Sequence, residues 1–388
     1  MLSTPLGREK PRTTLYQVVI DDIVESIRIG AFSFDHPICT ESKLMEKYNI
    51  SRITARRAMT ELENRGILYR KRGVGSFVSK DIYAKQAAPQ PANNLFAFIF
   101  PFNISRTGLT SAFQAANNLL IQKGCYASIY ITEDDLPSRG RTVLNQLVNM
   151  NVAGVAYYPK SSDIHISILN QLIFQGKPVV IMDIPSNCPY ISSVTSDNLS
   201  GSVQLMEHLI SLGHRRIAYV SGVGPEARRT VCDRIAGYMM AHEKAGLPLR
   251  GEYIVTDMGE SMRRQTAEGS GHTELANRVK ALVSQGVTAI MAEHDELAFD
   301  ILMACRDLHI SVPKDLSVCG FDDSEWAHML PGTITTIRQD QEQIGRHVAE
   351  LLLERMGNPL KTAQDMVVPA RLVVGNTTGP RSKDAPAD

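Results

Sequence analysis

Beyond residue 94 the chain alternates short, continuous apolar runs with longer amphipathic stretches. Several stretches close on a glycine, such as Gly124, Gly213 and Gly246, where helices commonly end. The apolar runs are LFAFIF (95–100), YASIYI (126–131), VAGVAYY (152–158), PVVIMD (178–183), RIAYVSG (216–222), AIMAE (289–293) and LSVCGFDD (316–323). Runs that are apolar throughout indicate parallel strands covered on both faces. Seven such strands are more than a single hydrophobic core accommodates. The pattern therefore predicts an α/β domain over 95–378 with two doubly wound parallel-sheet lobes.

The N-terminal part has a different pattern, with helical periodicity over 15–64 and then a short hairpin over 68–78. Thr40 is placed to cap one helix, and Ser51 to cap the next. Two short helices joined by a turn, followed by a hairpin, predict an α+β winged helix-turn-helix.

The second of these helices has two distinct faces. Ala55, Met59 and Leu62 recur at helical spacing and predict a buried stripe. Arg52 and Arg56 are four residues apart and share an exposed face. Arginines at the start of such a helix are suited to bond guanine edges in the major groove or to clamp phosphates.

The hairpin turns between Gly73 and Gly75, and Lys71 and Arg72 lie beside its tip. A basic tip of this kind fits a contact to the DNA backbone or minor groove.

Residues 80–94, KDIYAKQAAPQPANN, have no apolar periodicity and predict a linker. We therefore expect a head over 1–79, a body over 95–378 and a disordered tail over 379–388.

The 41 basic and 41 acidic side chains balance, but residues 1–80 hold 14 Lys and Arg against 9 Asp and Glu. This asymmetry favours a basic binding head. The six cysteines are scattered, which argues against a disulfide framework or a zinc site. The polar N-terminus is unlike a signal peptide, and no apolar run reaches the roughly 20 residues that span a bilayer. We expect a soluble, cytoplasmic protein with no metal, cofactor or membrane partner.

Residues 13–79 closely resemble the GntR-type winged helix-turn-helix, through TESKLMEKYNISRITARRAMTELENRGIL and the wing RKRGVGSFV. The resemblance implies that double-stranded DNA is contacted by Ser51, Arg52, Thr54, Arg56 and the Gly73–Gly75 wing. Ser42 stands where many members carry Arg, which implies an altered operator preference. The alternative interpretation is that the arginines form an ordinary solvated helix face.

Residues 95–375 resemble the periplasmic-binding-protein-like domain of the LacI/GalR family. The matching stretches include GHRRIAYVSG (213–222), RIAGYMMAHEKAGL (234–247), TAIMAEHDELAFDIL (288–302) and VPKDLSVCGFDD (312–323). A GntR-type head on such a body is the AraR-like regulator architecture. The resemblance implies a cleft between two lobes and an effector that is commonly a sugar or a nucleobase.

Ligands of open α/β sheets bind beyond the carboxyl ends of the strands. Asp183, Asp295 and Asp322 each follow a predicted strand, and carboxylates accept hydrogen bonds from hydroxyl-rich or amine ligands. By resemblance Asp322 is the best effector contact, and Phe102 and Asn103 line the same cleft. Each aspartate could instead cap a helix or form a salt bridge at a hinge.

Two positions depart from sugar-responsive relatives. Many have Arg five residues before the Gly of Gly237–Tyr238, where this chain has Cys232. Many have Asn before Asp295, where this chain has His294, a candidate effector contact that can titrate near neutral pH. These changes leave open a cleft with a different ligand, or with none.

The sequence therefore predicts a ligand-responsive transcriptional regulator, a homodimer on a palindromic operator, with repression the commoner sign for this architecture. One alternative is a small-molecule-binding protein without a transcriptional role. An enzyme is not expected, because no phosphate loop, nucleophile elbow or HExxH spacing is present.

Overall fold

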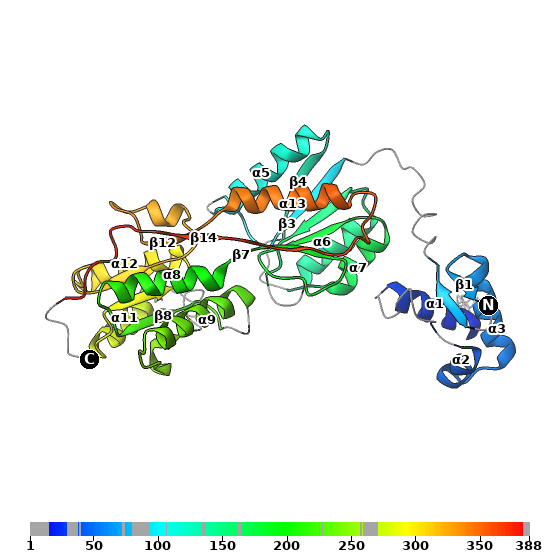
Figure 1. The fold of residues 1–388 in the computed structure, drawn as a ribbon, viewed down its shortest axis with the longest axis horizontal. Coiled ribbons are helices and arrows are strands. Elements are labelled where there is room, and N and C mark those ends of the chain that lie inside the picture. The colour runs from blue at the N-terminus through cyan, green and yellow to red at the C-terminus, as the bar shows by residue number, and fades with distance from the viewer. Residues whose placement is uncertain are drawn as a thin grey trace, which may run out of the picture. The chain divides into compact units, whose positions relative to one another are not determined.

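Figure 1 shows the computed structural model of the chain. It describes residues 15–28, 38, 40–71, 74–79, 94–105, 107–132, 137–160, 164–224, 226, 228–256, 258 and 271–382. The chain divides into two compact units, one made of residues 1–93 with Leu144–Met150 and His165–Lys177, and the other of the remaining residues. Apart from Asn94, the predicted linker lies outside the described residues.

The head packs its helices over a small apolar core and closes with an antiparallel hairpin. Its elements are α1 (Leu15–Arg28), α2 (Glu41–Tyr48), α3 (Arg52–Asn64), β1 (Leu68–Lys71) and β2 (Gly75–Val78). Both predicted caps form. Thr40 Oγ1 accepts from the Lys43 amide at 3.3 Å, and Ser51 Oγ accepts from the Thr54 amide at 3.2 Å. The predicted stripe on α3 is buried, which confirms the helical periodicity.

The first lobe of the body is a parallel sheet with strand order β13-β7-β6-β5-β3-β4. Its strands are β3 (Leu95–Phe100), β4 (Tyr126–Ile131), β5 (Gly154–Tyr157), β6 (Val179–Met182), β7 (Ser192–Ser196) and β13 (Asp365–Val368). Helices α5 (Leu109–Gln122) and α13 (Gln341–Arg355) share an apolar core with the sheet (Figure 1). Helices α6 (Pro137–Asn149) and α7 (Ile166–Phe174) connect β4 to β5 and β5 to β6.

The second lobe is a parallel sheet with order β11-β10-β8-β9. Its elements are β8 (Ile217–Val220), β9 (Ile254–Val255), β10 (Ala289–Ala292), β11 (Ser317–Cys319), α8 (Asn198–Ser211), α9 (Arg229–Lys244), α11 (Gly271–Ser284), α12 (Asp295–Asp307), η1 (Gly251–Tyr253) and η2 (Glu325–His328). Along β8, Ile217 and Tyr219 face the core shared with α8 and α9, whereas Ala218 and Val220 face the core shared with α11 and α12. Helices therefore cover both faces, as predicted.

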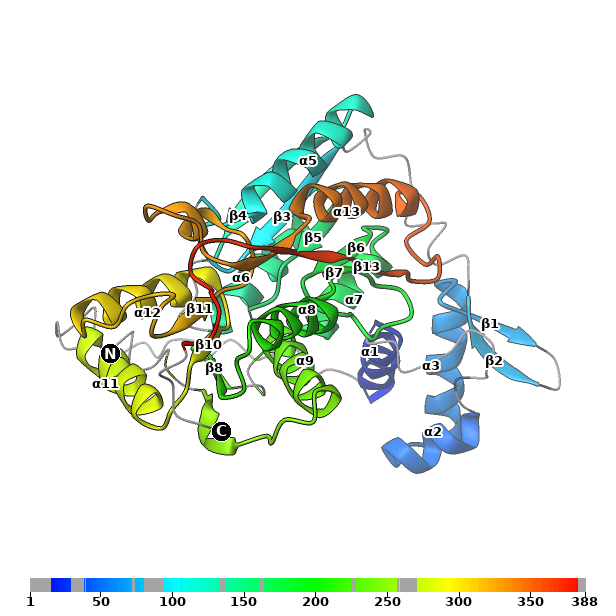
Figure 2. The same cartoon turned by 60° about the vertical axis from the view of Figure 1, so that its left-hand side comes forward.

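The strands β12 (Thr336–Gln339) and β14 (Ala370–Val373) pair antiparallel, and their Ile337 and Ala370 lie in the core that the second lobe shares with α8 and α9. The described chain crosses from lobe to lobe between β7 and α8, between β12 and α13, and between β13 and β14 (Figure 2). We call residues 196–198, 339–341 and 368–370, where these crossings occur, the hinge.

The predicted disordered tail starts too early. Gly379 is buried, and its carbonyl accepts from Nε2 of the buried His214 at 3.0 Å. The Arg381 amide donates to the Leu212 carbonyl at 2.9 Å. The prediction is therefore wrong for 379–382, because the second lobe supplies these residues with hydrogen-bond partners. Residues 383–388 lie outside the described chain.

Candidate functional sites

The predicted reading residues of α3 lie together at its N-terminal end. Arg52 and Arg56 are exposed, and Ser51 caps the helix. The Thr54 hydroxyl lies 2.9 Å from Ser51 Oγ. Because the buried stripe holds the opposite face in the core, this surface is turned outward.

Glu41, the first residue of α2, lies between two arginines of other elements. Its carboxylate is 3.6 Å from Arg52 Nε and 3.8 Å from Arg70 Nη2. The Arg52 side chain is 79% exposed, and exposed pairs of this kind contribute little stability. Both arginines can therefore exchange Glu41 for a phosphate at low cost.

The sequence prediction overlooked Ile53, which is 81% exposed directly beside Arg52. A large apolar side chain there suits contact with a thymine methyl group. In the wing, Lys71 is exposed at the end of β1, and Gly75 opens β2 with φ of 140°. Arg72 and Gly73 lie outside the described residues.

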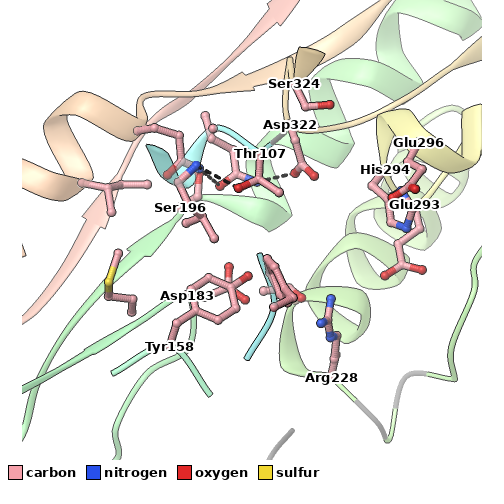
Figure 3. Close-up of a pocket in the computed structure, with 18 of the residues that line it drawn as sticks. Thr107, Tyr158, Asp183, Ser196, Arg228, Glu293, His294, Glu296, Asp322 and Ser324 are labelled. Atoms are coloured by element: carbon pink, nitrogen blue, oxygen red, sulfur yellow. Dashed lines mark hydrogen bonds between the residues drawn. The ribbon is translucent and has the colours of Figure 1, made fainter. Parts of the chain in front are cut away.

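A cavity of about 550 Å³ opens between the two lobes of the body. The first lobe contributes Phe102, Asn103 and Asp183 to its wall, and the second contributes His294 and Asp322. Figure 3 shows Asp183, His294 and Asp322 among the lining side chains. The structure thus brings together five of the six predicted effector residues.

Arg234 on α9 is the central cation of this cavity. Its Nη2 donates to Asp322 Oδ1 at 3.1 Å, its Nε to Asn198 Oδ1 at 2.9 Å and its Nη1 to the Glu293 carbonyl at 2.5 Å. Only 7% of its side chain is exposed. Because Asn198 lies in the hinge, Arg234 joins the cavity wall to a lobe crossing.

Asp322 is held from the hinge as well as from α9. Its Oδ1 also accepts from Gln339 Nε2 at 2.5 Å. Asp183 lies across the cavity beside Tyr158 (Figure 3). Burial raises the pKa of Asp183, and the nearby Arg228 partly offsets that rise. Burial likewise raises the pKa of the Tyr158 hydroxyl.

Asp295 does not line the cavity. It is fully buried, and its carboxyl accepts from the Ser324 amide at 2.7 Å, from Ser324 Oγ at 3.1 Å and from Thr336 Oγ1 at 2.6 Å. Burial, and then the charge of Asp322, raise its pKa to about 8. This placement argues against a direct effector contact and favours positioning of the segments around Ser324 and Thr336.

The two departures from sugar-responsive relatives have different outcomes. His294 lines the cavity and caps α12, its Nδ1 accepting from the Leu297 amide at 3.1 Å. Cys232 is exposed and is not part of the cavity wall. The guanidinium thought absent is supplied by Arg234, two residues further along the same helix. The position that faces the cavity on this turn of α9 is therefore 234 and not 232.

Other cavity residues were not anticipated, namely Ser196, Arg228, Glu293, Gln339 and Gln341. Ser196, Gln339 and Gln341 belong to the hinge, where the Asp that follows each of the two strands, Asp197 or Asp340, caps the next helix instead of lining the cavity.

Among the described residues, no group of three or more His, Cys, Asp or Glu side chains is placed to hold a metal ion. No helix in that part of the chain combines the length and apolarity needed to cross a bilayer.

Two family models match the chain. Residues 15–78 match the bacterial regulatory proteins of the gntR family, and residues 206–378 match the periplasmic binding protein-like domain. These matches agree with the head and with the larger part of the body.

Curated relatives extend the likeness over nearly the whole chain. The arabinose metabolism transcriptional repressor of Halalkalibacterium halodurans is 28% identical over 94% of this chain and 96% of its own length. The protein of the same name from Geobacillus stearothermophilus is also 28% identical, over 94% and 97%. The gntR family and these relatives are named as transcriptional regulators.

Solved structures show the fold of the body. A complex of the transcriptional regulator CelR with cellobiose has a TM-score of 0.63 at 22% identity and covers 84% of this chain and 91% of its own. A LacI family regulator from Enterococcus faecium with bound ribose has a TM-score of 0.60 at 22% identity, covering 74% and 99%. The chain is therefore a transcriptional regulator that joins a GntR-family DNA-binding domain to a periplasmic-binding-protein-like domain of the kind found in LacI-family regulators.

Proposed function

We propose that this regulator is a repressor controlled by a neutral, hydroxyl-rich effector, a sugar, bound in the interlobe cavity. The observation that carries the proposal is the pair Arg234–Asp322, which faces the cavity and is bonded on both sides to the hinge residues Asn198 and Gln339. A paired cation and carboxylate offer donors and acceptors without net charge, which suits sugar hydroxyls. The names of the relatives, which refer to arabinose, and the bound cellobiose and ribose support a sugar.

Within this cavity we assign effector contact to Phe102, Asn103, Asp183, His294 and Asp322. Asp295 is assigned a supporting role, because its oxygens already accept hydrogen bonds. Effector binding closes the two lobes about the hinge and changes the spacing of the heads in a dimer.

For DNA we assign base reading to Arg52, Thr54 and Arg56. Ser51 and the wing residues Lys71, Arg72, Gly73 and Gly75 contact the sugar-phosphate backbone. The exposure of the arginine face supports this assignment. Because the proposed target is chromosomal DNA, we infer that the protein acts in the cytoplasm.

The proposed homodimer is supported by exposed apolar side chains on an edge strand of the first lobe. β4 is an edge strand of its sheet, and Tyr126, Ile129 and Ile131 are 60%, 37% and 41% exposed on it. Exposed apolar edge strands invite pairing with another chain. A two-fold dimer matches a palindromic operator.

The test combines gel-shift titration against a selected operator pool with addition of arabinose, ribose or cellobiose. We expect tight binding to a subset of sequences, and weaker binding when the right sugar is present. An affinity that is equal for all sequences and insensitive to salt would contradict this proposal. It would favour the alternative, a small-molecule-binding protein without a transcriptional role.

A further inference from the structure

Two polar atoms of the interlobe cavity have no hydrogen-bond partner among the described residues, Ser196 Oγ and Gln341 Oε1. Ser196 ends β7 and is 6% exposed, and Gln341 begins α13. Both belong to the hinge, and Figure 3 shows Ser196 among the cavity-lining side chains. Because folded proteins rarely leave a buried polar atom unpaired, two such atoms in one cavity point to a group that arrives with the ligand.

The hydrogen-bonding character of Gln341 follows from its neighbours. Asp322 accepts from Arg234, and as a carboxylate it can only accept. Gln339 therefore turns its amide nitrogen to Asp322, at 2.5 Å, and its carbonyl accepts from Gln341 Nε2 at 3.2 Å. This order leaves the Gln341 carbonyl oxygen, an obligate acceptor, as the free end of the chain.

We propose that Ser196 and Gln341 form a subsite for one hydroxyl group of the effector. The inference rests on the proposed function and specifies the chemistry of that same cavity. A hydroxyl donates its hydrogen to Gln341 Oε1 and accepts from Ser196 Oγ. A carboxylate has no hydrogen to donate to Gln341, and an ammonium cannot accept from Ser196.

The subsite also connects the effector to the moving part of the body. A hydroxyl bound there extends the chain of hydrogen bonds that runs through Gln341, Gln339, Asp322, Arg234 and Asn198. This series of hydrogen bonds begins and ends on hinge segments. The effector hydroxyl therefore binds at the place where the lobes rotate against each other.

The test compares the full-length variants Ser196→Ala and Gln341→Met with wild type, using arabinose, ribose and cellobiose as probes in calorimetric titration. Each variant should bind the responsive sugar about three- to tenfold more weakly, as expected for the loss of one hydrogen bond. Free Ser196→Ala should melt no lower than wild type, because the removed hydroxyl has no partner. Ser202→Ala is the matched control, since Ser202 Oγ is also buried and unpaired but does not line the cavity. It should leave the affinity unchanged.

Unchanged sugar affinity in both cavity variants would overturn the subsite and leave the proposed function standing. A lower melting temperature of free Ser196→Ala would also overturn it, because the hydroxyl would then have a partner in the protein. If no probe binds wild type, the sugar effector and the subsite fall together. Mono-deoxy derivatives of the bound sugar identify the hydroxyl. The derivative that lacks it should bind wild type more weakly than the parent sugar does. It should bind Ser196→Ala with the same affinity as the parent sugar does.

Discussion

The reading surface of the head and the cavity of the body are built in opposite ways. On the head, Ser51, Arg52, Thr54 and Arg56 follow one another on one helix end, and the arginines are exposed. In the cavity, Asp183, Arg234 and Asp322 come from distant parts of the chain, and Arg234 is almost completely buried. A local surface can change its specificity without unfolding the domain, whereas a residue of the cavity also stabilises the lobes and the hinge.

This contrast predicts that removing a buried, hydrogen-bonded side chain of the cavity costs stability, whereas removing an exposed arginine of the head costs only affinity. Arg234→Ala should have the largest effect, because it leaves Asp322 and Asn198 without their partner. We expect a loss of about 3–5 kcal/mol in the free energy of unfolding, measured by urea titration of the body. The effector response should disappear as well.

Arg229→Ala is the matched control, since Arg229 lies on the same helix in an exposed pair with Asp233. It should change stability by less than about 0.5 kcal/mol. Equal effects of the two substitutions would contradict the role of Arg234 in stabilising the cavity.

Asp295 should make the stability of the body depend on pH. Its folded pKa of about 8 lies above the ordinary value of 3.8, so the native state keeps a proton that the unfolded chain has lost. The free energy of unfolding should therefore fall as pH rises from about 4 to 8, by at most about 1.4 kcal/mol per pH unit. Above the folded pKa this contribution becomes constant.

Asp295→Asn resembles the protonated side chain and should flatten that slope, as followed by urea denaturation at several pH values. Parallel curves for variant and wild type would show that Asp295 is ionised in the folded protein at neutral pH. The head, whose reading residues lie outside this network, should bind DNA without the same dependence.

Arg52→Ala should weaken specific DNA binding by about 1–3 kcal/mol in gel-shift titration. Because the side chain is exposed, the unfolding midpoint should not move. Arg65→Ala, at the other end of the same helix, serves as the control and should bind as wild type does. A loss of affinity with Arg65→Ala but not with Arg52→Ala would mean that the C-terminal end of α3, and not its N-terminal end, contacts the DNA.

Ser51→Ala should have the smallest of these effects. It removes the cap of α3 and should cost the head about 1 kcal/mol of stability. Sugar affinity should stay at the wild-type value, as measured by calorimetry. Any change in that affinity would mean that the head and the cavity communicate without DNA.

The strands and caps were predictable to the extent that their signals are local. β3 and β4 coincide with the apolar runs 95–100 and 126–131, and Ser51 forms the expected cap. β7 was missed because its sequence, SSVTS, is polar. Bonds to the neighbouring segment satisfy two of its buried hydroxyls: Ser193 Oγ donates to Asp365 Oδ1 at 2.5 Å, and Ser192 Oγ accepts from the Gln364 amide at 3.1 Å.

The sequence by itself determined the reading helix, the two-lobed body and three aspartates at strand ends, because each depends on residues within a few positions of one another. Only the tertiary structure decided which of these side chains meet. It turned Asp295 inward, placed Arg234 where Cys232 had suggested a gap, and brought Ser196 and Gln341 to one cavity from crossings far apart in the chain. Hydrogen-bond partners in the folded body are set by packing over long sequence separations, and no local pattern records them.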